Sequence, residues 1–323
     1  MVNKLLLRGG VLILLALVLC VFAAGRGFAL EKIKMGSPVK TNPQVALPFL
    51  AAEAKGFWTK QGLEVDWRPF RSGGAVARAV AARAINLGTT VVVWGIRSIS
   101  RGIPMVLVGD LNQSLGWAIW VRIESPLKKI RQLKGTKVGI TRTGSGTHAF
   151  GTALAQTLGL EKDIQFVATG GVPQLLAALK AQAVDGIVLT KMVMIKLVAK
   201  GQARKLVGMD EYLPKPWVSR AMFATPEYIK EKPNTVRRMI RGMRSAHQFI
   251  DADQSWSTKK LMAEYGYSQK LAEQVYKAVN WQTTMRINRA AVQNVADFLV
   301  KYRLAKKGEI PPLNQLFTNR FVD

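Results

Sequence analysis

The sequence predicts an α/β fold made of two units of similar pattern. Short apolar segments typical of strands alternate with polar or glycine-containing turns, and most of these turns lead into a helical pattern. The alternation breaks after Asn112 and starts again at Trp117. A repeated strand–turn–helix order implies a parallel sheet, and its turns gather at the carboxyl ends of the strands, where α/β proteins bind ligands.

The first unit contains predicted strands at 33–37, 63–67, 85–88 and 104–111. Helices are expected at 47–54, from 74 to 84, and from Thr89-Thr90 to about Arg101. Pro48 is acceptable there because it is expected in the first turn of its helix, and Gly56 is expected to end that helix. Three polar turns, 40–44, 72–74 and 89–90, should therefore lie along one edge of the sheet.

The second unit contains predicted strands at 117–121, 137–140, 164–168, 184–189 and 205–207. A helix over 173–182 places Leu175, Leu176 and Leu179 on one apolar stripe.

From about Trp217 the pattern returns to a strand, 218–224, and is helical from there to about Tyr302. Met239, Met243, His247 and Ile250 recur at helical spacing, which favours core packing over a metal or cofactor site.

The start of the chain has the pattern of a secretory signal peptide. Lys4 and Arg8 precede an uncharged apolar run of 14 residues, 11–24, and small residues stand at the −3 and −1 positions of Gly27-Phe28-Ala29. The run is short for a membrane-spanning helix, and an uncleaved anchor is the alternative. Lipid attachment at Cys20 is not expected, because Leu19 is not small. Cleavage after Ala29 leaves 323 − 29 = 294 residues, enough for two domains.

Composition argues against several classes of protein. The net charge of +27 becomes +24 without the three basic residues of the leader, and the charges are spread along the chain. No basic arm, helix-turn-helix or paired cysteines accompany them, so nucleic acid is not an expected partner. Cys20 is the only cysteine, so the mature chain would have no disulfide, thiolate nucleophile or cysteine metal ligand. We expect no cofactor and no metal.

A glycine-rich run, 141–148, follows the predicted strand 137–140 and opens a helix to about Leu158. Small residues allow close approach, and the unpaired N–H groups at a helix start suit an anion. The alternative is an ordinary turn that binds nothing. The glycine spacing matches neither the Walker pattern nor the dinucleotide-binding pattern, which argues against a nucleotide.

Four segments together resemble a known family. They are Gly56-Phe57-Trp58 with Gly62-Leu63-Glu64-Val65, then Ser72-Gly73-Gly74, then 132–139, and then Ala178-Leu179 with Ala183-Val184-Asp185-Gly186. In this order the chain resembles the solute-binding proteins of nitrate, sulfonate and taurine importers, close to those for thiamine precursors. It departs from the family pattern at Asn86, where Asp is usual, at Gln182-Ala183, and at Thr190-Lys191, which replaces a frequent Trp/Glu-Pro pair.

The resemblance implies a fold like that of type II periplasmic binding proteins, in which two α/β lobes joined by two crossover strands close on a ligand. It implies a first lobe of 30–112 plus 218–323, including the C-terminal helices, and a second lobe of 117–215.

If the lobes face each other, the turns of both line one cleft. The candidate ligand-binding residues of the first lobe are Thr41, Asn42, Gln44, Ser72, Gly73, Thr89 and Thr90. Those of the second lobe are Gly144, Ser145, Thr147, His148, Gly171, Thr190 and Lys191. Hydroxyls, amides and helix-start N–H groups hold an ion by several hydrogen bonds without one fixed countercharge. Trp94 and Trp217 either wall an apolar ligand tail or, as favoured, pack in the core.

The resulting hypothesis is a monomeric, periplasmic substrate-binding protein of an ABC importer. It captures a small organic anion, first an aliphatic sulfonate or a taurine-like acid, and delivers it to the permease in the inner membrane. Nitrate or bicarbonate, a thiamine precursor and an aromatic acid are the alternative ligands. An enzyme that makes a thiamine pyrimidine on this fold is disfavoured, since only His148 and His247 are present and the mature chain has no cysteine. An effector domain of a transcription regulator is disfavoured because the leader stands where the DNA-binding part belongs.

Overall fold

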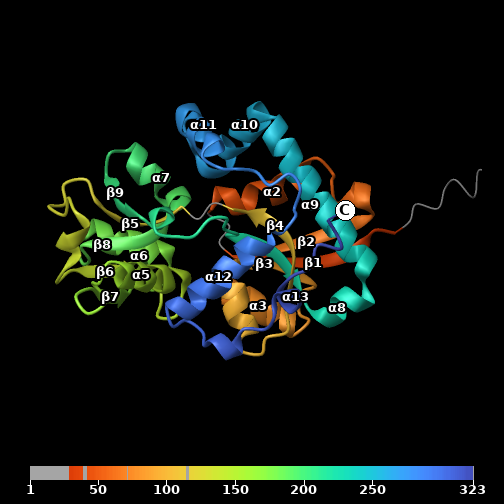
Figure 1. Cartoon of the computed structure of the whole chain (residues 1–323). Coiled ribbons are helices and arrows are strands. Elements are labelled where there is room, and N and C mark those ends of the chain that lie inside the picture. Colours follow the sequence, from red (N-terminus) through yellow and green to blue (C-terminus); the bar gives the residue numbers. More distant parts are fainter. Residues whose placement is uncertain (1–28, 39–41, 71, 114–115, 323) are drawn as a thin grey trace, which may run out of the picture.

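The computed structural model describes residues 29–38, 42–70, 72–113 and 116–322. All of the expected leader except Ala29 lies outside these residues, as does the candidate site residue Thr41. Within them the chain forms two lobes, each with a five-stranded sheet at its centre (Figure 1). No helix of the described part combines the length and the apolar character needed to cross a membrane.

The sheet of the first lobe has the order β2-β1-β3-β10-β4. Its strands are β1 (Glu31–Pro38), β2 (Leu63–Phe70), β3 (Leu87–Val91), β4 (Val106–Asn112) and β10 (Arg220–Ala224). β1 runs parallel to both β2 and β3, whereas β10 is antiparallel to both β3 and β4.

The second lobe repeats this arrangement with the order β7-β6-β8-β5-β9. Its strands are β5 (Trp117–Arg122), β6 (Lys137–Ile140), β7 (Gln165–Ala168), β8 (Gly186–Thr190) and β9 (Ala203–Gly208). Here β6 is parallel to β7 and β8, and β5 is the strand that runs antiparallel to its neighbours.

Helices cover both faces of each sheet. In the first lobe they are α2 (Pro43–Ala54), α3 (Gly73–Ala81), α4 (Val92–Ile99), α8 (Pro226–Glu231), α9 (Pro233–Ala252), α10 (Gln254–Tyr265), α11 (Gln269–Lys277), α12 (Arg289–Lys301) and α13 (Leu313–Leu316). In the second lobe they are α5 (Gly146–Thr157), α6 (Val172–Lys180) and α7 (Lys191–Ala199). The buried side chains of α2 and α9 form one core with one face of the first sheet, and those of α3, α4 and α12 pack on the other face.

The chain passes between the lobes twice, after β4 and again after β9. The lobes also touch on both sides of these crossings. On one side Phe150 of α5 packs against Phe298 of α12, with ring centroids 5.8 Å apart. On the other side Lys196 of α7 donates a hydrogen bond to the carbonyl of Tyr265, at the end of α10. The structure therefore shows the lobes in contact.

Two features of the fold differ from the sequence-based expectation. The sheets are mixed rather than parallel, because the strand that returns from each crossing is reversed. The helix with Pro48 begins at Pro43, so Pro48 lies in its interior and not in its first turn. Proline has no N–H to bond the carbonyl four residues earlier, so the carbonyl of Gln44 loses its intrahelical partner.

The pair Thr89-Thr90 was expected to form a turn, but it lies within strand β3. β3 continues to Val91 and α4 begins directly after it. Neighbouring residues of a strand point to opposite faces, so the two threonine side chains lie on opposite sides of the sheet. The Met stripe of α9 is buried in the core, as predicted: Met239, Met243, His247 and Ile250 are at most 2% exposed.

Candidate interlobe site

One edge of each sheet faces the other lobe. This edge holds the carboxyl ends of the parallel strands, and it also holds the first residue of each reversed strand, Arg220 of β10 and Trp117 of β5. Sequence reasoning missed both residues because it searched only the turns that follow strands. The missed signal was the chain's reversal after each crossing, which brings the start of a strand to the binding edge.

In the first lobe the end of β3 carries two buried hydroxyl groups without partners. Oγ1 of Thr89 and Oγ1 of Thr90 form no hydrogen bond in the described part of the chain. A Cβ atom on Gly73 would stand 2.4 Å from Oγ1 of Thr90, so the start of α3 lies directly beside this hydroxyl group. Buried polar groups normally have partners, so the two hydroxyls indicate a site for a polar ligand.

Arg220 lies on the Thr89 side of the same sheet. Its Nη1 atom is buried and has no hydrogen-bond partner among the described residues. Arg220 also forms no ion pair with any described residue. Burial lowers the pKa of Arg220 to about 10, so the guanidinium is still charged at neutral pH. An unpaired charge in this position costs free energy of folding, and an anionic ligand would remove that cost.

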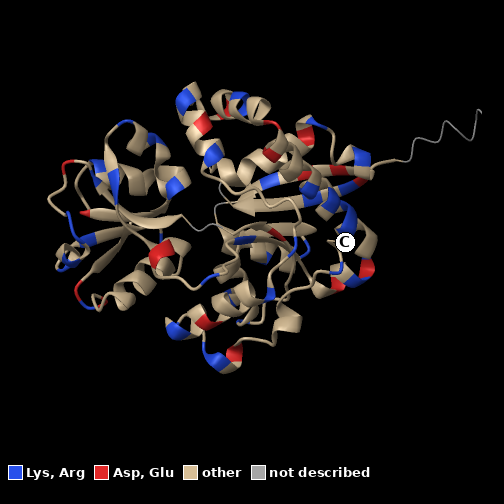
Figure 2. Ribbon diagram, turned by 45° about the horizontal axis from the view of Figure 1, so that its top comes forward, with Lys and Arg blue, Asp and Glu red and all other residues tan. Residues whose placement is uncertain are grey.

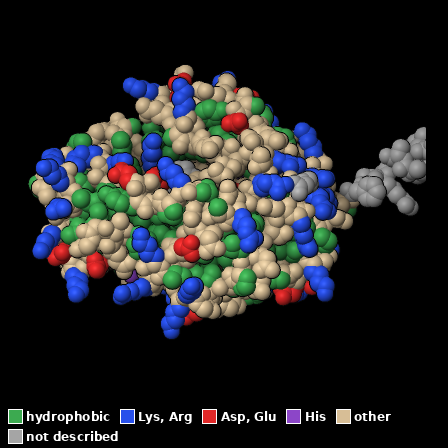
Figure 3. Space-filling view, viewed as in Figure 1, with side chains coloured by type: hydrophobic (Ala, Val, Ile, Leu, Met, Phe, Trp, Pro, Cys, Tyr) green, Lys and Arg blue, Asp and Glu red, His purple; other side chains and the backbone are tan. Residues whose placement is uncertain are grey.

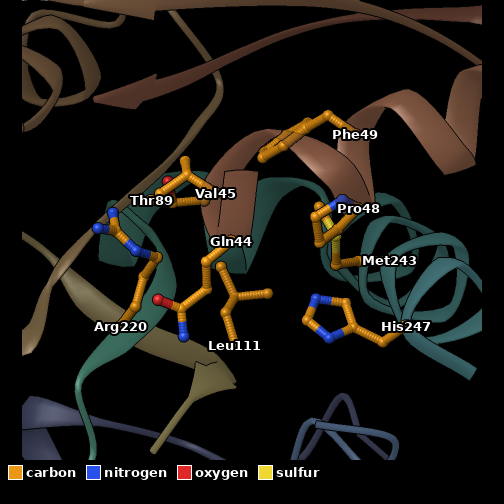
Figure 4. Close-up of a pocket in the computed structure, with 9 residues that line it drawn as sticks. All are labelled: Gln44, Val45, Pro48, Phe49, Thr89, Leu111, Arg220, Met243 and His247. Atoms are coloured by element: carbon orange, nitrogen blue, oxygen red, sulfur yellow. The ribbon is translucent and has the colours of Figure 1, made fainter. Parts of the chain in front are cut away.

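A small cavity of about 10 Å³ opens between α2, α9 and the sheet beside Arg220 (Figure 4). Gln44 and Thr89 line it near Arg220, and Met243 and His247 line it at the other end. The volume is that of about one water molecule. Burial lowers the pKa of His247 to about 3, so this imidazole is neutral.

The other candidate residues of the first lobe cap helices. Asn42 accepts the N–H of Gln44 at 3.0 Å, and Ser72 accepts the N–H of Ala75 at 3.3 Å. Their side chains therefore fix the starts of α2 and α3, whose free N–H groups point to the cleft edge.

The glycine-rich turn of the second lobe is closed by its own hydrogen bonds. Ser145 caps α5, and its hydroxyl lies 2.8 Å from the hydroxyl of Thr147. Thr147 in turn accepts the N–H of Thr141 at 2.8 Å. Gly144, with φ +75°, donates its N–H to Nδ1 of His148 at 3.0 Å. These side chains hold the turn in shape, which leaves the first N–H groups of α5 for a ligand.

The remaining candidates of the second lobe differ in whether their polar groups are free to bind a ligand. Oγ1 of Thr190, at the end of β8, is buried and has no partner in the described part of the chain. Lys191 begins α7 with an exposed side chain, and its N–H donates to the carbonyl of Gly116 at 2.7 Å. Gly171 precedes α6 at the edge strand β7, and its N–H donates to Gln174 at 3.1 Å. Thr190 is therefore the candidate of this lobe with an unused buried hydroxyl.

Trp94 and Trp117 meet over Gly146. A Cβ atom on Gly146 would stand 3.0 Å from Nε1 of Trp94 and 3.4 Å from the ring of Trp117. Trp94 comes from α4 of the first lobe, so the two lobes are in close contact at this glycine. Nε1 of Trp94 is buried without a described partner. Trp217, in contrast, packs edge-on against Phe298 in the core.

Arg97 lies one helical turn after Trp94, and its guanidinium stacks over the Trp94 ring at 4.8 Å. Nε of Arg97 is buried without a described partner. Burial, followed by the positive charge of Arg97, lowers the pKa of His148 across the cleft. The facing edges of the two lobes thus carry hydrogen-bond donors from both lobes, and the first lobe adds the positive charges of Arg97 and Arg220. No group of three or more His, Cys, Asp or Glu residues gathers within the described residues.

Comparisons with known proteins agree with this architecture. The family described as NMT1/THI5 like matches residues 42–255. A protein of Brucella abortus, named as a candidate binding protein, is 26% identical over 206 residues, and the match covers 62% of each chain. The chain thus spans less than two thirds of that curated relative.

Solved structures show the same fold at low identity. The alkanesulfonate-binding protein SsuA of Xanthomonas axonopodis pv. citri, bound to MOPS, is 18% identical with a TM-score of 0.73, covering 88% of this chain and 95% of that one. The periplasmic nitrate-binding protein NrtA of Synechocystis PCC 6803 is 15% identical with a TM-score of 0.68, covering 90% and 87%. The fold is that of two-lobed, type II periplasmic binding proteins.

Proposed function

The chain belongs to the NMT1/THI5-like family, and from this premise we propose that it captures a small organic anion between its lobes and delivers it to the permease of an ABC importer. The lobes are 30–112 with 218–323, and 117–215. The leader directs the chain to the periplasm, where it acts as a monomer without a cofactor. An aliphatic sulfonate or taurine-like acid is the first ligand class to test, followed by nitrate or bicarbonate and thiamine precursors.

The observation that carries this proposal is the unpaired, buried guanidinium of Arg220 at the cleft edge. The free hydroxyl of Thr89 lines the same cavity, and the second lobe has a free buried hydroxyl of its own at Thr190, at the end of β8. A ligand that accepts hydrogen bonds from both lobes stabilises the closed form, whereas a ligand that touches one lobe does not. The anion thus supplies both the missing countercharge and the driving force for closure.

The proposal does not depend on the charge of the protein surface. Lysine and arginine residues are spread over both lobes and are interspersed with acidic ones (Figures 2 and 3). They form no single basic face in these views. Specific recognition is therefore assigned to the few buried donors of the cleft.

The test is a thermal-shift panel on residues 30–323, because a ligand that binds the folded state raises its apparent stability. The panel contains ethanesulfonate, taurine, nitrate, bicarbonate, propionate and a pyrimidine alcohol. At least one anion should raise Tm, and Arg220→Gln should weaken its binding by about 10- to 100-fold, the value of a charged hydrogen bond. No shift with any anion would contradict the proposal.

Arg122→Gln is the matched control. This half-buried arginine of β5 donates to the carbonyls of Leu179 and Val184, away from the cleft edge. Its loss should lower stability and leave ligand affinity unchanged. Arg220→Gln should lower ligand affinity and leave stability unchanged, because removing an unpaired buried charge does not destabilise the ligand-free protein. Equal ligand affinities in the wild type and Arg220→Gln would remove Arg220 from the site.

A further inference from the structure

The first lobe offers the cleft two arginines that the described residues leave without an acidic partner. Arg220 begins β10, and Arg97 lies on α4, and neither takes part in an ion pair of the described chain. Each also has a buried nitrogen without a hydrogen-bond partner there, Nη1 of Arg220 and Nε of Arg97. A ligand with one acidic group would neutralise only one of these two guanidinium groups.

The two arginines lie on opposite faces of the sheet. Arg220 shares its face with Thr89 and the cavity under α2 (Figure 4). Arg97 belongs to the other face, where α4 and Thr90 lie, and after burial its positive charge is the further cause that lowers the pKa of His148 of the second lobe. A ligand seated at the end of β3 therefore meets one guanidinium on each side.

Arg97 is held in place for such a contact. Its guanidinium stacks on the Trp94 ring at 4.8 Å, which fixes its plane and leaves its edge free to donate. The start of α5 lies beside Trp94, at Gly146, and its N–H groups are also donors with partial positive charge. Donors thus face donors across this part of the cleft, and an acceptor group between them would relieve the mismatch.

Nearby carboxylates do not supply that acceptor. Asp110, at the end of β4, accepts the N–H of Asn112 and the amide of Gln113, and so belongs to the crossing segment. Asp210, at the start of the other crossing, is exposed and accepts the backbone N–H of Gly116 on the first crossing. Both carboxylates therefore accept hydrogen bonds within the segments that connect the two lobes.

We propose that the ligand carries two acidic groups, one held by Arg220 and Thr89, and the other held by Arg97 and the start of α5. This inference rests on the proposed capture of an organic anion and narrows its substrate class to short disulfonates, sulfocarboxylates or dicarboxylates. A ligand with an ammonium group at its far end, such as taurine, would place a positive charge beside Arg97. The second acidic group reaches the second lobe and so contributes directly to closure.

The experiment measures affinities by calorimetry for matched pairs: ethanesulfonate with ethane-1,2-disulfonate, and propionate with succinate, with taurine as the zwitterionic member. In the wild type, the dianion of at least one pair should bind about tenfold more tightly than its monoanion, and taurine should bind no better than ethanesulfonate. Arg97→Gln should reduce the dianion preference to about twofold or less, because it removes the contact to the second acidic group.

The control is Arg101→Gln, which removes the same charge from an exposed turn just after α4. It should leave the dianion preference intact. Equal affinities within each pair in the wild type, or an unchanged preference in Arg97→Gln, would overturn the inference while capture of an anion still stood. Failure of every probe to bind would overturn the proposed function itself, and the two-anion ligand with it.

Discussion

The hydroxyl groups of Thr157 and Tyr302 lie 2.6 Å apart and join the two lobes by a hydrogen bond. Thr157 ends α5 of the second lobe, and Tyr302 follows α12 of the first. This bond joins residues of different lobes, so we expect it to stabilise their closed arrangement rather than the fold of either lobe. It lies away from the ligand candidates and can be removed without touching them.

Tyr302→Phe should therefore weaken ligand binding by about 0.5–1.5 kcal/mol, the net value of one hydrogen bond, through a less stable closed form. Calorimetry with the best anion of the panel measures this. Tyr276→Phe is the matched control, because that hydroxyl bonds the carbonyl of Asp251 at 2.7 Å within the first lobe. Tyr276→Phe should lower the free energy of unfolding but leave ligand affinity unchanged. Equal losses of ligand affinity in both variants would refute the assignment of the Thr157–Tyr302 bond to the closed form.

Gly146→Ala should impair closure. The added methyl group would stand 3.0 Å from Nε1 of Trp94, closer than a side chain normally tolerates. Since Trp94 belongs to the other lobe, the open form escapes this contact and the closed form does not. We expect ligand affinity to fall by about tenfold, with an unchanged Tm of the ligand-free protein. Gly308→Ala, where nothing lies within 4 Å, is the control. An unaltered affinity in Gly146→Ala would show that this contact is not part of closure.

Ser145→Ala should act on stability. The Ser145 hydroxyl caps α5 and bonds Thr147, so its loss removes an N-cap worth about 1 kcal/mol. Urea unfolding of the ligand-free protein measures the difference. Replacement by Asn, another good capping residue, should restore most of the stability. A Ser145→Ala variant as stable as the wild type would contradict the role of this hydroxyl as a cap.

Two buried groups should give opposite dependences of stability on pH. Burial raises the pKa of Asp110 to about 7, so its stabilising effect is present in acid and is lost as pH rises through about 7. Burial lowers the pKa of His247 to about 3, so the unfolded state takes up a proton below about 6.5 and stability falls as the pH falls further. Between about pH 4 and 6.5 the two effects oppose each other.

Asp110→Asn should therefore steepen the loss of stability between pH 6.5 and 4, while His247→Gln should make stability rise toward acid. Urea unfolding at several pH values, compared with the wild type, separates the two effects. Parallel pH profiles for the wild type and both variants would contradict these assignments.

The alternation of strands and helices was predictable from sequence because apolar periodicity and glycine or proline turns are local signals. The predicted strand 137–140 coincides with β6, and Gly56 follows α2 with the positive φ of +63° expected at a helix end. The direction of β5 and β10 is not a local property. It depends on the crossings between lobes, so a sequence pattern read as parallel sheets gave the wrong direction for these two strands.

The candidate site shows the same difference between features that are visible in the local sequence and features that depend on the three-dimensional structure. Thr89, Thr90 and Thr190 were selected as candidates from their predicted position after strands, and all three have unused buried hydroxyls in the described chain. Arg220 was missed because an arginine at the start of a strand resembles any surface arginine until its partners are known. Ser145 and Thr147 were selected for their chemistry, but their hydrogen bonds to each other and to the turn became visible only in three dimensions.

The central claim is that two lobes close on a small organic anion. Small-angle X-ray scattering of residues 30–323, recorded without ligand and with each anion of the panel, tests it most directly. The account predicts a smaller radius of gyration with the anion that raises Tm most, and no such change for Arg220→Gln at the same anion concentration. Scattering curves that are identical with and without every anion of the panel would contradict it.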